Sequence, residues 1–111
     1  MKLKDIAKAL DLKIKAGENL LDREVTGGYA SDLLSDVLAN AKKGNIWVTL
    51  QTHLNIVAVA SATDLCGIII VNNRIPEEET LKKAEEERIP ILVSSSATFK
   101  VAARLYELGL R

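Results

Sequence analysis

The stretch "NIWVTLQTHLNIVAVASATDLCGIIIV", residues 45–71, decides the fold class. Its first part, 45–50, and its last part, 66–71, are rich in β-branched residues, which predicts two strands. The middle part, 53–63, is apolar enough to be a buried strand or a buried helix. We expect a helix, because alanines favour one, Thr52 can cap it, and parallel strands need a crossover between them.

The same alternation of strands and helices extends on both sides of this stretch. Further strands are expected at 23–26 and 90–94, with a strand or an extended linker at 12–15. Further helices are expected at 3–10, from a Ser31 cap to a stop at Gly44, from Pro76 onward, and at about 98–108. In the helix after Ser31, the core-facing stripe is expected to comprise Leu33, Leu34, Val37, Leu38 and Ala41.

This order of elements predicts an α/β fold. We expect a single compact domain over residues 1–111, with a mostly parallel sheet of about four to five strands covered by helices. Residues 1–22 would contribute a helix and a short strand or linker, and the alternating units would follow from residue 23.

Composition excludes several classes of protein. The chain is 48% apolar and 27% charged, which excludes a disordered segment. Fifteen basic residues balance fifteen acidic ones, so we expect neither a nucleic-acid nor a membrane partner. Cys66 is the only cysteine, and its apolar setting suits a reducing compartment. No stretch approaches the roughly 20 apolar residues of a membrane span. We therefore expect a cytoplasmic protein.

Candidate binding residues gather where the expected strands end. In open α/β sheets, ligands bind at the carboxyl ends of parallel strands, where helix N-termini present free N–H groups. We call this border of the sheet the strand-end edge. The candidate ligand-binding residues there are Gln51, Thr52, His53, Asn72, Asn73, Ser94, Ser95 and Thr98.

The chemistry of these residues favours binding over catalysis. Hydroxyls and amides offer many hydrogen bonds to a neutral polar or phosphorylated molecule. No carboxylate pair and no His/Cys cluster with metal spacing accompanies them, so we predict no enzyme activity, no cofactor and no metal. The alternative is that these residues only cap helices and form turns, with Arg74 a solvated loop cation.

Thr26, Gly27 and Gly28 raise a separate question, whether they form a phosphate cradle or a corner. They lack the Gly-Lys-Ser/Thr ending of a Walker loop and the spacing of a dinucleotide fingerprint. Turn chemistry explains them, so we expect them to end the strand at 23–26.

Three segments, "GNIWVTLQTHLNIVAVA", "GIIIVNNRIPEEE" and "ERIPILVSSSATFKVAARLYELG", resemble a DRTGG domain, and the resemblance runs over residues 23–111. That family is named for an Asp-Arg and a Thr-Gly-Gly that follow two successive strands. At the corresponding places this chain has Thr52-His53 and Asn72-Asn73, so both named motifs are altered.

The resemblance implies a module akin to the amino-terminal domain of HPr kinase/phosphorylase. Such modules accompany CBS domains, family II pyrophosphatases and long forms of phosphotransacetylase, where they support dimerisation and transmit a metabolite signal. We therefore expect a non-catalytic regulatory module that forms a homodimer and senses a nucleotide-like or phosphorylated metabolite. The alternative is an adaptor or assembly protein that acts on a protein partner without a small-molecule ligand.

Overall fold

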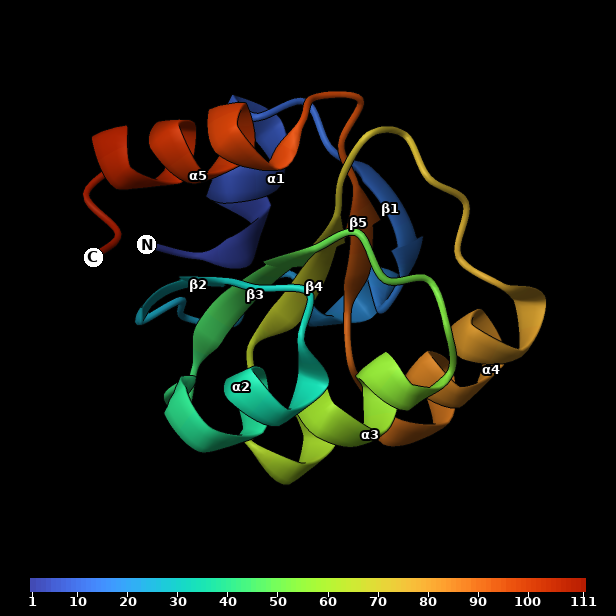
Figure 1. Ribbon diagram of the computed structural model, residues 1–111. Coiled ribbons are helices and arrows are strands. Elements are labelled where there is room, and N and C mark those ends of the chain that lie inside the picture. Colours follow the sequence, from blue (N-terminus) through green and yellow to red (C-terminus); the bar gives the residue numbers. More distant parts are fainter.

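Five strands form one sheet, and five helices cover it in the computed structural model, which describes residues 1–111 (Figure 1). The strands are β1 (Lys13–Ala16), β2 (Gly27–Ala30), β3 (Asn45–Thr49), β4 (Gly67–Ile70) and β5 (Ile91–Val93). The helices are α1 (Leu3–Ala9), α2 (Leu34–Asn40), α3 (Asn55–Ala62), α4 (Glu78–Glu87) and α5 (Thr98–Glu107), with a 3₁₀ turn at Glu18–Leu20. None of the helices combines the length and the apolar character needed to cross a bilayer.

The sheet is mostly parallel, as predicted. Its strand order is β1-β5-β4-β3-β2, and the four strands from β2 to β5 run parallel to one another. Only β1 is antiparallel, and it pairs with β5 at one edge with a register irregularity between Ile14 and Ala16. The ambiguous segment 53–63 forms the helix α3, which provides the crossover between β3 and β4. The predicted α/β fold class is therefore confirmed.

The helices cover the two faces of the sheet unequally. Figure 1 shows α2, α3 and α4 on one face, and α1 and α5 on the other. Every residue of β3, β4 and β5 is buried, which requires apolar cover on both faces. Two hydrophobic clusters provide it: one joins Leu3, Ile6, Val101 and Leu105 to the sheet, and the other contains Val37, Ile56 and Ala84.

The first parallel strand lies later in the chain than predicted. Residues 23–26 form no strand, and Gly27 and Gly28, which were expected to end one, instead begin β2. A Cβ atom on Gly27 would lie 3.1 Å from the carbonyl oxygen of Arg111 and 3.1 Å from Asn45 Nδ2. Gly27 thus permits the close approach of two other segments inside a strand, and the corner interpretation was wrong.

Helix α2 is shorter than predicted. The Ser31 hydroxyl accepts a hydrogen bond from the N–H of Leu33, but the helix begins only at Leu34 and ends at Asn40 because the next residue is extended. Within the expected stripe Val37 is fully buried, whereas Leu33 is 64% and Leu38 49% exposed. The core-facing side of α2 therefore excludes two of the five residues of the expected stripe.

We predict that the central strand carries much of the stability. Ile69 in β4 is fully buried, whereas Ile75 in the following loop is 84% exposed. Truncating a buried isoleucine to alanine lowers the free energy of unfolding by about 2–5 kcal/mol. The same change at an exposed position alters it by less than about 0.5 kcal/mol. Urea unfolding of the Ile69→Ala and Ile75→Ala variants measures the two free-energy changes. Equal losses of stability in the two variants would contradict the burial of β4 on both faces.

Candidate functional site

Four parallel strands end at one border of the sheet, which forms the strand-end edge. The segment after β3 contains Gln51, the segment after β4 contains Asn72, and the segment after β5 contains Ser94. Because β3, β4 and β5 are adjacent and parallel, these three segments lie next to one another. The structure thus brings together residues that are far apart in sequence.

The segment after β3 is held by its own hydrogen bonds. Gln51 Nε2 donates to the carbonyl oxygen of Asp32 over 3.0 Å. The carbonyl oxygen of Thr52 accepts a hydrogen bond of 2.8 Å from Thr80 Oγ1, so Thr52 anchors α4 and does not cap α3. His53 Nδ1 accepts from the N–H of Asn55 over 3.2 Å. These three candidates fix the loop in place.

The segments after β4 and β5 are tied to each other. The N–H of Asn73 donates to the Ser94 carbonyl oxygen over 2.7 Å, and the N–H of Asn72 donates to the Ser96 carbonyl oxygen over 2.9 Å. Ser94 is buried, and its hydroxyl accepts from the N–H of Ser96. Asn72, Asn73 and Ser95 have exposed side chains, while Thr98 is half-buried in the first turn of α5. The exposed amides and hydroxyl are the groups available to a ligand.

Asn72 and Asn73 both adopt left-handed backbone conformations, with φ angles of 58° and 54°. Asparagine tolerates this region better than most residues, because its short polar side chain can hydrogen-bond locally. The pair therefore turns the chain sharply at the end of β4.

The connections after β4 and β5 lead to opposite faces of the sheet. The loop after β4 continues into α4 on one face, and the loop after β5 continues into α5 on the other (Figure 1). In open α/β sheets, such a divergence between neighbouring strands is the switch point where ligands bind. Asn72, Asn73 and Ser95 lie at this point, whereas Gln51 lies one strand away.

Asp32, which the sequence interpretation missed, organises the end of β2. Its Oδ1 atom accepts hydrogen bonds from Thr49 Oγ1 over 2.9 Å and from the N–H of Leu50 over 2.7 Å. Ser31 and Asp32 are typical turn residues, but the strand was expected four residues earlier, at 23–26, so both residues fell into the expected helix.

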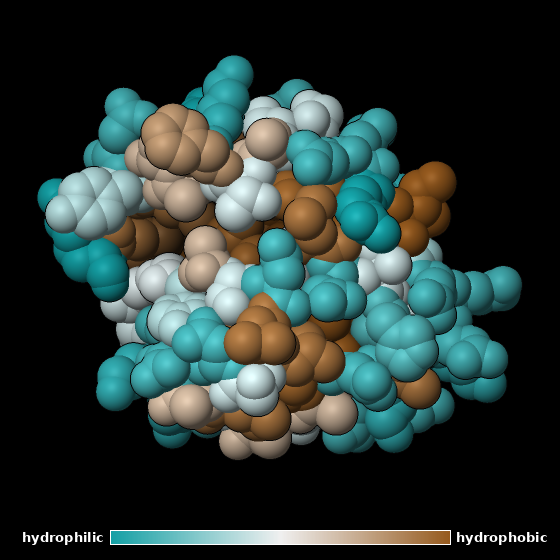
Figure 2. Space-filling view, in the orientation of Figure 1, coloured by the Kyte–Doolittle hydropathy of each residue, from teal (hydrophilic) through white to brown (hydrophobic).

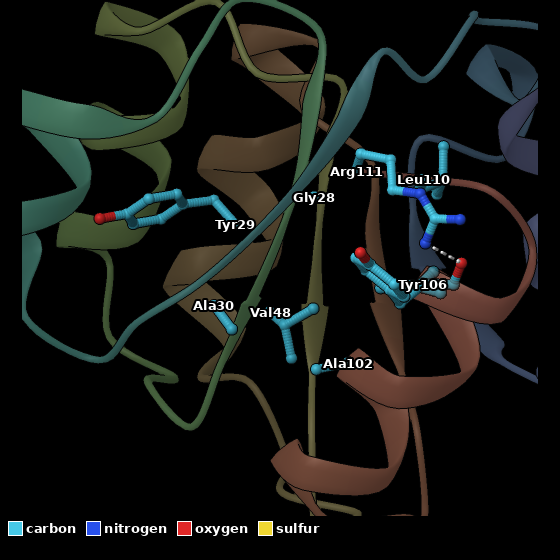
Figure 3. A pocket seen from close by; sticks show the side chains of 9 residues that line it. Gly28, Tyr29, Ala30, Val48, Ala102, Tyr106, Leu110 and Arg111 are labelled. Atoms are coloured by element: carbon cyan, nitrogen blue, oxygen red, sulfur yellow. Dashed lines mark hydrogen bonds between the residues drawn. The ribbon is translucent and has the colours of Figure 1, made fainter.

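A hollow lies between α5 and the edge strand β2, and none of the eight predicted residues lines it (Figure 3). It has a volume of about 160 Å³ and is lined mainly by apolar residues, among them Val48, Ala102 and Leu105. The guanidinium of Arg111 lies 3.8 Å from the centre of the Tyr106 ring and donates to the Tyr106 carbonyl oxygen. The apolar lining suits packing against another apolar surface.

Cys66 is a poor nucleophile in this fold. It is buried directly before β4, at the opposite border of the sheet from His53. Burial raises the pKa of the Cys66 thiol to about 11, so the thiolate that would react is scarce near neutral pH. The structure contains no group of three His, Cys, Asp or Glu residues arranged to hold a metal ion.

These observations define a three-layer α/β domain whose polar loops meet at one border. The chain belongs to the DRTGG domain family, whose family model matches residues 5–108. The resemblance noted in the sequence is thus confirmed, and the match also covers most of α1 and all of β1. The residues at the two named motif positions remain Thr52-His53 and Asn72-Asn73.

A solved structure shares this fold. It is the CBS and DRTGG domains of the regulatory region of a Clostridium perfringens pyrophosphatase, complexed with the activator diadenosine tetraphosphate. The TM-score is 0.73 at 16% sequence identity, over 97% of this chain and 46% of that chain. Similarity at this identity establishes the fold. Comparison with curated proteins found no match.

We predict that Asp32 stabilises the strand-end edge through its acceptor oxygen. Asp32→Ala leaves the Thr49 hydroxyl and the Leu50 N–H without their partner and should destabilise the fold by about 1–3 kcal/mol. Asp32→Asn keeps a carbonyl acceptor and should retain most of the stability. Thermal and urea unfolding compare the two variants. A negligible loss in Asp32→Ala would show that the hydrogen bonds contribute little, and equal large losses would show that a neutral acceptor does not replace the carboxylate.

Proposed function

We propose that this DRTGG domain acts as a single regulatory unit over residues 1–111, without catalysis, and binds a nucleotide-like or phosphorylated metabolite at the strand-end edge. The observation that carries the proposal is the switch point between β4 and β5, where Asn72, Asn73 and Ser95 have exposed polar side chains. Amides and hydroxyls can hydrogen-bond the oxygen atoms of a sugar or a phosphate.

Two further observations support a role in binding. The exposed groups at the switch point include no acid or base suited to proton transfer near neutral pH, and the buried thiol of Cys66 is held neutral. The pyrophosphatase structure of the same fold is described as a regulatory region bound to a nucleotide activator. For the cellular location we propose the cytoplasm, since a buried free thiol suits a reducing compartment.

We expect a metabolite to raise the melting temperature of the protein, because a ligand that binds only the folded state stabilises it. A thermal-shift screen of nucleotides, nucleosides and phosphorylated metabolites would identify it. Asn72→Gly removes the amide but keeps the left-handed backbone, and should weaken the shift. Asp64→Gly, a left-handed position at the opposite border of the sheet, is the matched control. No shift with any compound would contradict the binding proposal, and so would equal shifts in both variants.

We further propose that the protein forms a homodimer through the outer face of α5. Phe99 is 88% and Tyr106 60% exposed, and Ala103 between them is also exposed. These three residues, which we call the α5 stripe, lie on one side of the helix because they are four and seven positions apart. Figure 2 shows apolar atoms over α5, beside an apolar recess beneath the helix.

The charges beside the α5 stripe favour a second copy of this chain as its partner. Lys100 lies in the first half of the helix and Glu107 at its end. If two α5 helices pair antiparallel about Ala103, Lys100 of each copy comes near Glu107 of the other, and the two stripes cover each other. An isologous contact of this kind is the commonest way in which chains assemble.

Light scattering should return about twice the monomer mass of 12.1 kDa. Phe99→Glu places a charge in the proposed interface and should give a monomer, because an unpaired charge is costly to bury. Leu33→Glu, at an exposed leucine directly before α2 on the opposite face, should leave the dimer intact. A wild-type protein of about 12 kDa would contradict the dimer and leave the α5 stripe to a different protein, as in the adaptor alternative.

A further inference from the structure

A cationic hollow lies beside the switch point. Three basic residues line it, and no acidic residue does. Its volume is about 190 Å³, and its lining residues are Lys13, Lys15, Asn73, Arg74, Ile75 and Val93. The hollow adjoins the strand-end edge because Asn73 belongs to both.

The antiparallel strand β1 brings the two lysines to this place. Lys13 is paired with Val93, the last residue of β5, so the start of β1 lies at the strand-end edge. The register irregularity between Ile14 and Ala16 inserts Lys15 as an extra residue. Two cations from β1 thus lie beside the carboxyl end of a parallel strand.

The loop after β4 supplies the third cation. The left-handed backbone at Asn73 and its 2.7 Å hydrogen bond to the Ser94 carbonyl oxygen hold this loop against the end of β5. Arg74 follows directly, and its N–H donates to the carbonyl oxygen of Val71 over 3.2 Å. Two backbone hydrogen bonds therefore hold the segment that leads into Arg74.

None of the three cations forms an ion pair, although Lys15 also borders a neighbouring hollow lined by Glu18 and Glu85. The chain as a whole carries fifteen basic and fifteen acidic residues, so this cluster is a local excess of positive charge. Like charges around one hollow repel one another, and an anion placed among them removes that repulsion.

We propose that the cationic hollow binds the phosphate groups of a soluble metabolite. The inference rests on the proposed function and adds detail to it. It assigns the phosphate groups of the ligand to the cationic hollow and the rest of the ligand to the switch point. The volume of 190 Å³ corresponds to roughly six molecules of liquid water, enough for a short chain of phosphates but not for a whole nucleotide. The remainder of the ligand would lie over Asn72 and Ser95 at the switch point.

The residue types in the hollow suit this role. An arginine guanidinium can donate two parallel hydrogen bonds to one phosphate, and a lysine ammonium adds a compact point charge. The amide of Asn73 offers an additional donor. Because the cluster is open to solvent, its attraction for anions should weaken as salt screens it.

Calorimetric titration at low salt with tripolyphosphate, ATP and adenosine tests the proposal. Tripolyphosphate and ATP should bind, and Arg74→Gln and the double variant Lys13→Gln/Lys15→Gln should each weaken binding about tenfold or more. Lys8→Gln/Lys82→Gln removes two charges from exposed helix positions outside the hollow and should bind as the wild type does. All these positions are exposed, so unchanged melting temperatures should confirm that the variants fold.

Three outcomes would overturn the proposal. The first is that neither tripolyphosphate nor ATP binds, and the second is that the hollow variants and the control variant bind them with equal affinity. The third, from a parallel titration with vesicles of anionic lipid, is binding to the vesicles alone that depends on the hollow. Failure of the hollow proposal can be distinguished from failure of the proposed function. Adenosine and the neutral compounds of the thermal-shift screen carry no phosphate, so they test binding at the switch point alone. A shift with those compounds together with no tripolyphosphate binding would remove the hollow and keep the regulatory site.

Discussion

Burial of β4 on both faces is the constraint on which the architecture depends. Each residue from Gly67 to Ile70 is buried, so the strand needs parallel neighbours on both sides and apolar helices above and below. The crossovers α2, α3 and α4 all cover one face, because right-handed connections between strands added in one direction stay on the same side. The other face is left to α1 and α5. The change of side therefore falls between β4 and β5, and this fixes the switch point.

Most polar groups at the strand-end edge serve the fold itself. Asp32, Gln51 and Thr52 join neighbouring loops through hydrogen bonds, so the loops are positioned before any ligand arrives. The exposed side chains there are those of His53, Asn72, Asn73 and Ser95. The geometry suits recognition at a shallow surface by a small number of preorganised contacts.

The sequence predicts the parts of the fold that depend on local pattern. Apolar periodicity and element order indicate α3, β3, β4 and the parallel sheet, and the parallel sheet brings Gln51, Asn72 and Ser94 to one border. Long-range contacts decided the rest. Gly27 looks like a turn residue until the approach of Arg111 is known, so β2 and the role of Asp32 were misplaced. Lys13 and Lys15 lie beside the switch point only because β1 pairs antiparallel with β5, and no local sequence pattern predicts that contact.

The loop at Ser94–Ser96 closes one side of the switch point and, through Ala97, leads directly into α5. Its carbonyl oxygens hold Asn72 and Asn73, while the helix that it begins carries the α5 stripe. A molecule that displaces this loop on binding therefore changes the orientation of α5. If that orientation sets how tightly two copies associate, linkage requires the effect to be reciprocal, so that association alters affinity for the molecule by the same factor. The short loop at Ser94–Ser96 would then couple the concentration of the metabolite to the association of the two copies.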